Sequence, residues 1–202
     1  LVAEKYGCRF VPEIHVSGNI GFEKRVMGLH YDREKEELVE LRDGAKDQVI
    51  VDLDGRTKVS WRPFGYNALH PAVQQLYIDL IGELADELAD CTSFAGISSR
   101  LMLSWQWAGF NALPGLKYGY GDWTVDQFEQ DTGIRVPGAN DEPGRFRKRF
   151  AFLTGPQREA WTAWRCHRIF DFHCRIRDRI RGAKPGTSLY LTYFGPAERE
   201  AL

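Results

Sequence analysis

The chain has 202 residues, of which 43% are hydrophobic and 27% charged, and its formal net charge is −1. These values are typical of a folded domain with one sizeable core. The net charge excludes a protein that binds polyanions through an overall positive charge. No apolar run approaches the roughly 18 residues that a membrane helix needs, so we expect no membrane partner. No signal peptide is visible, and the sequence indicates neither a compartment nor an oligomeric state.

Six main elements follow from hydrophobic periodicity. In chain order they are a strand over 8–16, a helix over 71–88, a strand over 94–103, a helix over 124–132, a helix over 156–181 and a strand over 188–194. Between the first strand and the first helix, residues 17–67 alternate in short runs. Turn signals at Asp43-Gly44 and Asp54-Gly55 favour a hairpin-rich insertion there.

The alternation of strands and helices predicts an α/β fold with a parallel sheet. No glycine-rich phosphate fingerprint follows any strand, which disfavours a nucleotide-binding doubly wound sheet. Long insertions follow the strands, at the end where a (β/α)8 barrel, also called a TIM barrel, builds its active site. Since a complete barrel takes about 250 residues, we expect residues 1–202 to form a single domain that is a partial barrel, one piece of a larger catalytic domain.

Three segments resemble the glycosyl-hydrolase-like TIM-barrel family. They are NALHPAVQQLYIDLIGELADEL with FAGISSRL, GYGDWTVDQFEQDTGIRVPG, and REAWTAWRCHRIFDFHCRIRDRIRGAKPG. The resemblance implies a glycosidase or glycosidase-like protein that acts on a carbohydrate. Related barrels often carry acidic residues at the end of the strand that corresponds to 94–103, whereas this chain has Ser98, Ser99, Arg100 and Leu101 there.

Polar residues alternate with apolar ones on the predicted strands. Glu13 and His15 share one face of the first strand, and Arg100 lies on the polar face of the next. A carboxylate beside an imidazole can bind sugar hydroxyls or move a proton; the alternative is a polar pair that supports the mouth of the barrel. Arg100 needs a partner, for which Glu13 is a candidate, and it either orients a carboxylate or forms a structural ion pair.

Asp122 precedes the helix expected over 124–132. Thr124 and Gln127 suggest a capping box, which leaves Asp122 free for a site, although a local turn role competes. Glu13 and Asp122 are therefore the candidate catalytic carboxylates for glycoside hydrolysis, with a further carboxylate possible outside this chain.

The stretch from Ser104 to Thr124 holds six aromatic residues and four glycines. Aromatic rings stack on the apolar faces of sugars, so this loop fits a carbohydrate platform; a self-packed minicore is the alternative. Trp105, Trp107 and Tyr120, together with His15 and Arg100, are the candidate substrate-binding residues.

Twelve Lys/Arg and three Asp/Glu occur between Arg145 and Lys184. This excess of basic residues could indicate a nucleic-acid-binding module. However, arginines that surround an apolar stripe favour a solvated outer helix face, so we expect no nucleic-acid partner. The four cysteines form no C-x-x-C pair, which predicts buried free thiols and no metal site. The sequence thus favours a glycoside hydrolase without cofactor that takes an oligo- or polysaccharide. The alternative is a non-catalytic carbohydrate-binding or structural member of the same fold.

Overall fold

A computed structural model describes residues 2–14, 23–58, 64–101 and 115–193. The helices are α1 (Val2–Lys5), α3 (Pro71–Glu87), α4 (Asp122–Thr132), α5 (Arg145–Thr154) and α6 (Arg158–Ala183). The strands are β1 (Glu13–Ile14), β2 (Leu29–Asp32), β3 (Glu37–Glu40), β4 (Gly96–Leu101) and β5 (Ser188–Tyr193). A π-helical turn, η1 (Glu23–Met27), and a 3-10 turn, η2 (Ala45–Gln48), complete the set.

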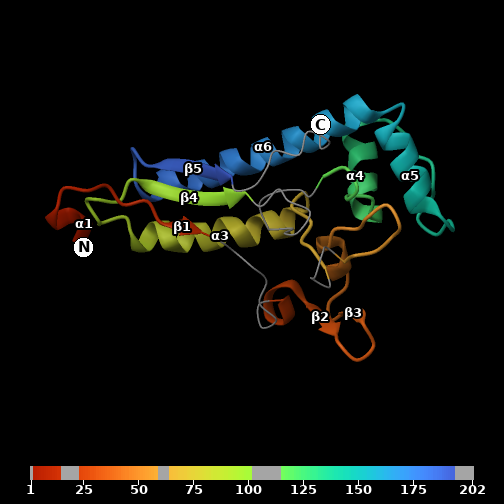
Figure 1. The fold of residues 1–202 in the computed structure, drawn as a ribbon, viewed down its shortest axis with the longest axis horizontal. Coiled ribbons are helices and arrows are strands. Elements are labelled where there is room, and N and C mark those ends of the chain that lie inside the picture. Colours follow the sequence, from red (N-terminus) through yellow and green to blue (C-terminus); the bar gives the residue numbers. More distant parts are fainter. Residues whose placement is uncertain (1, 15–22, 59–63, 102–114, 194–202) are drawn as a thin grey trace.

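A parallel sheet of order β1-β4-β5 forms the centre of one core (Figure 1). Glu13 pairs in register with Ser98, and Ser98 with Tyr190. Helices α3 and α6 run along this sheet and bury Ile97 against apolar side chains such as Phe172 and Ile176. The apolar period of the two helices explains this packing, since each helix has one stripe that must leave water.

The expected partial TIM barrel is wrong. The described residues form five strands in two separate sheets, and no barrel is closed. In a barrel every strand has a neighbour on both sides, whereas β1 and β5 each have one neighbour in the described sheet. Alternating strands and helices predict parallel pairing and crossover helices, but they do not specify whether the sheet closes, because strand periodicity is the same in both cases.

The predicted helices and later strands lie close to their expected positions, and the insertion differs more. One hairpin, β2–β3, pairs Leu29 with Glu40, whereas the segment around Asp54-Gly55 makes a turn flanked by isolated bridges. Helix α5 was not expected from the sequence. Its segment RFRKRFAFLT is basic and only 10 residues long, and its apolar side chains, among them Phe146, Phe150 and Leu153, pack into the second core described below.

A second core joins α4, α5 and the first half of α6. The rings of Trp161 and Trp164 stack at 5.3 Å between centroids, and Phe128 meets Trp161 edge-on at 5.2 Å. Tyr120 stacks on Trp161 in the same cluster. This core anchors the start of α4, where one of the candidate site residues lies.

The four cysteines are free, but the expectation that they are buried is wrong: Cys8 and Cys166 are exposed, and Cys91 and Cys174 are only partly buried. No helix in the described part of the chain is long and apolar enough to cross a membrane.

Candidate functional site

The expected site residue Asp122 lines an open groove with a volume of about 960 Å³. Its walls come from the β2–β3 hairpin, from η2 with the segment 49–58, and from the first residues of α4 and α5. The lining side chains that can bind a ligand are Tyr31, Arg33, Glu36, Lys46, Asp47, Arg56, Thr57, Lys58, Asp122, Trp123, Arg145 and Phe146.

Helix α4 begins at the groove, two residues earlier than expected. Its N-cap is Gly121, which makes no side-chain cap, and Asp122 is the first helical residue. The expected capping box of Thr124 with Gln127 is wrong, because Thr124 is buried and accepts a hydrogen bond from Asn67 Nδ2 at 2.9 Å. A Cβ at Gly121 would lie 3.3 Å from Val51 Cγ2, so the close approach of segment 49–58 favours glycine there.

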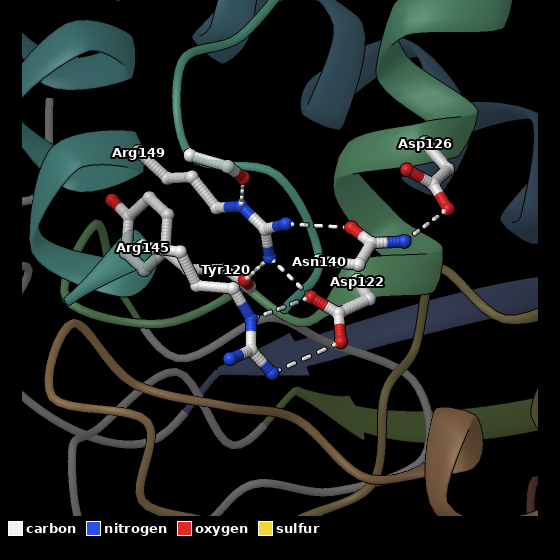
Figure 2. Close-up of polar contacts among 7 residues, drawn as sticks. Tyr120, Asp122, Asp126, Asn140, Arg145 and Arg149 are labelled. Atoms are coloured by element: carbon white, nitrogen blue, oxygen red, sulfur yellow. Dashed lines mark hydrogen bonds and ion pairs between the residues drawn. The ribbon is translucent and has the colours of Figure 1, made fainter. Parts of the chain in front are cut away.

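The carboxylate of Asp122 is held by two arginines from α5 (Figure 2). Arg145 donates from Nε to Oδ1 at 3.0 Å and from Nη2 to Oδ2 at 3.2 Å. Arg149 donates from Nη1 to Oδ1 at 2.6 Å. The planar guanidinium of Arg145 thus binds the carboxylate with two parallel hydrogen bonds, the strong arrangement of this pair.

Arg149 is buried and makes further hydrogen bonds that fix its position. Its guanidinium donates to the carbonyls of Gly138 at 3.1 Å and Tyr120 at 3.0 Å, and to Asn140 Oδ1 at 2.8 Å (Figure 2). Asn140 in turn donates to Asp126 at 3.3 Å. The network ties α5 to α4 and to the loop between them, so Asp122 has a clear structural role.

Two carboxyl groups in the groove have pKa values that move in opposite directions. Burial raises the pKa of Asp122, but hydrogen bonds from Arg145 and Arg149 outweigh it, so this pKa lies below its ordinary value. Burial raises the pKa of Asp47, and the carboxylates of Glu40, Asp122 and Asp126 raise it further. Sequence reasoning missed Asp47, because nothing in its local pattern shows that the fold places it near other acids.

Aromatic rings also line the groove. Trp123 lies against His70 with 4.5 Å between ring centroids, and the guanidinium of Arg145 lies 4.3 Å from the ring centroid of Phe146. Tyr31 and Trp123 are both partly exposed. The groove therefore combines flat apolar surfaces with charged hydrogen-bonding groups.

A second polar cluster lies on the parallel sheet, outside the groove lining. Arg100 Nη2 donates to Glu13 Oε1, the pairing that the strand alternation suggested. Thr192 donates to Glu13 Oε2 at 2.8 Å, and its hydroxyl lies 3.3 Å from that of Ser98. The cluster crosses all three strands near their carboxyl ends, where open α/β sheets place their ligands.

The expected site residues thus fall in different places. Glu13 and Arg100 lie together on the sheet, and Asp122 lies in the groove within a separate ion-pair network. Tyr120 is fully buried; its hydroxyl donates to the carbonyl of Leu116, and burial raises its pKa to about 12. Tyr120 is therefore part of the core. His15, Trp105 and Trp107 lie outside the described residues.

The basic segment from Arg145 to Lys184 carries many ion pairs within the described chain. Besides the pairs with Asp122, they are Arg147–Asp54, Lys148–Glu142, Arg168–Asp131, Arg177–Asp178 and Arg179–Asp86. Within the described ranges, no three His, Cys, Asp or Glu side chains gather in a way that could hold a metal ion.

Comparisons of the chain with protein-family models, with curated proteins and with solved structures gave no match. The resemblance to the glycosyl-hydrolase-like barrel family is therefore wrong, since neither a family model nor the open three-stranded sheet supports it. Much of the quoted resemblance consists of helix signals, such as Pro71 at the start of α3 and Gly133 after α4. Such signals mark helix ends in many unrelated α/β folds.

Proposed function

We propose that the groove binds an oligosaccharide. The observation that carries the proposal is the presence of the partly exposed rings of Tyr31 and Trp123 in one open groove with charged side chains. Sugar rings have apolar faces that stack on aromatic rings, and their hydroxyls hydrogen-bond to carboxylates and guanidinium groups. A volume of about 960 Å³ is at the upper end for small-molecule sites, and an open groove suits a chain of sugars.

Binding without hydrolysis is the form of this function that the carboxylates favour. Glycoside hydrolysis needs a carboxylic acid that protonates the leaving oxygen and a second carboxylate nearby. Asp122 has a lowered pKa and accepts three hydrogen bonds from arginines, so it is a poor proton donor and a weak base. Asp47 has a raised pKa and is the better proton donor in the groove, but the arginine-bound Asp122 is a poor second carboxylate to act with it. Glu13 is paired with Arg100 in a different cluster.

The test is affinity gel electrophoresis on a panel of soluble polysaccharides, followed by calorimetry with matching oligosaccharides. We expect Trp123→Ala to weaken binding about tenfold, because it removes a stacking surface. Trp123→Phe keeps a ring and is expected to stay within about threefold of the parent protein. The matched control is Phe170→Ala on α6, an aromatic side chain with 63% exposure that does not line the groove.

Circular dichroism of each variant separates loss of binding from loss of folding. The proposal would be contradicted if no polysaccharide in the panel retarded the protein on the gel. It would also be contradicted if the Trp123→Ala variant folded and bound saccharides as tightly as the parent protein. Release of reducing ends by the parent protein that is lost in Asp122→Asn would instead demonstrate hydrolysis and overturn the purely binding role.

A further inference from the structure

We infer that the groove selects acidic saccharides, whose rings carry carboxylate or sulfate groups. This inference rests on the proposed saccharide binding and adds the charge of the ligand to it. It comes from the cations in the groove lining, which sequence reasoning did not bring together.

Basic side chains outnumber acidic ones in the groove. Five lining residues are basic, namely Arg33, Lys46, Arg56, Lys58 and Arg145, and three are acidic, namely Glu36, Asp47 and Asp122. Asp122 is already neutralised by Arg145 and by Arg149 behind it. The remaining lining therefore carries more positive than negative charge, although the whole chain has a net charge of −1.

Three of these cations have no carboxylate within ion-pair distance among the described residues: Arg33, Lys46 and Lys58. Arg56 pairs with Asp54 at 3.5 Å. The four basic residues of α5, by contrast, each have an acidic partner. Cations that share a concave surface raise the local concentration of anions and attract acidic ligands.

The three unpaired cations come from other parts of the groove wall than Trp123 and Phe146, whereas Tyr31 lies on the hairpin with Arg33. Arg33 lies in the turn between β2 and β3, Lys46 in η2 and Lys58 in the segment that follows, whereas Trp123 and Phe146 come from α4 and α5. A ligand that uses both parts needs a flat apolar face and an acidic substituent. A uronic acid or a sulfated sugar has both, and the fork of Arg33 can bind a carboxylate or a sulfate with two hydrogen bonds.

Calorimetry with a matched pair of ligands tests the inference. Hexagalacturonate carries a carboxylate on each ring, and its fully methyl-esterified form has the same backbone without charge. We expect the acid to bind at least about tenfold more tightly at low ionic strength. Its affinity is expected to fall as NaCl rises from about 50 to about 500 mM, because salt screens exposed charges. A carrageenan hexasaccharide, which carries sulfate groups but no carboxylate, is a second arm that distinguishes sulfate from carboxylate recognition.

Charge-neutralising variants locate the effect. Arg33→Gln and Lys58→Gln are each expected to weaken binding of hexagalacturonate about three- to fivefold and to leave the methyl ester unaffected. The matched control is Lys5→Gln, an exposed lysine that does not line the groove; its helix α1 lies at the left end of Figure 1, away from the hairpin and from α4 and α5.

The possible outcomes are distinct. Equal affinity for the acid and its ester, with both weakened by Trp123→Ala, overturns the charge selectivity and leaves the saccharide groove standing. Binding of no saccharide, charged or neutral, overturns both. Tighter binding of an oligothymidylate of matched charge than of either acidic saccharide overturns the inference in favour of a nucleic-acid ligand.

Discussion

Arg149 on α5 has 1% of its side chain exposed, and it donates a hydrogen bond of 2.6 Å to Asp122 at the first turn of α4. A guanidinium is stable in such a place only when acceptors surround it, and the nearby backbone carbonyls and Asn140 supply the others. Asp122 is therefore the counter-ion for the packing of α5 against α4. The residue that the sequence singles out for chemistry is above all a structural anchor of the groove.

The first prediction concerns this pair. Asp122→Asn leaves a buried cation without its carboxylate, and we expect the free energy of unfolding to fall by about 2 kcal/mol, since Asp122 is itself partly exposed. The matched control is Asp126→Asn, whose carboxylate contacts the exposed Asn140, with an expected change of about 0.5 kcal/mol or less. Urea denaturation measures both, and equal losses in the two variants would refute the anchoring role.

The second prediction concerns pH and His70, the N-cap of α3. Its Nδ1 accepts from the backbone N–H of Ala72 at 3.2 Å, and burial lowers the pKa of His70 from 6.5 to about 4. Between these two values the unfolded chain binds the proton and the folded chain does not. This contribution to stability is therefore complete above about pH 6.5 and is lost as the pH falls towards about 4.

A matched variant isolates that effect. His70→Asn keeps an N-cap acceptor but does not titrate, so the decline in Tm from pH 6.5 to pH 4 should be shallower than in the parent protein. Some slope remains, because burial also lowers the pKa of His173. Identical slopes in the two proteins would show that His70 does not set the pH dependence.

The third prediction compares two glycines. Gly96 begins β4 with a φ of 142°, and a Cβ there would lie 1.9 Å from the carbonyl oxygen of Ser188 on β5. Gly96→Ala should cost about 3 kcal/mol or more, because the two strands must move apart. Gly182 in α6 has open space around its Cβ position, and Gly182→Ala should stabilise the protein by up to about 1 kcal/mol. Thermal unfolding of both variants measures this, and changes of the same sign would contradict the geometry.

The fourth prediction separates the sheet cluster from the groove. Glu13→Gln weakens its ties to Arg100 and Thr192, and stability should fall by about 1 kcal/mol, since the pair is partly exposed. Saccharide binding should not change, because Glu13 does not line the groove. A variant that folds but binds saccharides at least about tenfold more weakly would instead place the ligand on the sheet.

Most of the helices and strands can be predicted from local sequence patterns. The stripe that begins at Val73 predicts α3, and the alternation around Ile97 predicts β4, because side-chain periodicity depends only on the local backbone geometry. The same alternation suggested the contact between Arg100 and Glu13, since neighbouring parallel strands bring their polar faces together. Each of these predictions needs only the side-chain periodicity of one element and the identity of its neighbouring strand, and both can be read from the sequence.

The sheet topology, the ion-pair network and the groove depend on how distant elements pack together. Hydrophobic periodicity identifies the face of a helix or strand that is buried, but it does not identify the element that packs against that face. It therefore could not distinguish an open sheet of three strands from a barrel. Asp122 and Arg149 are 27 residues apart and meet only because α5 packs against the start of α4. The groove likewise joins Arg33, Lys58 and Trp123 from separate segments. Such contacts arise from how whole elements pack, which no local pattern encodes.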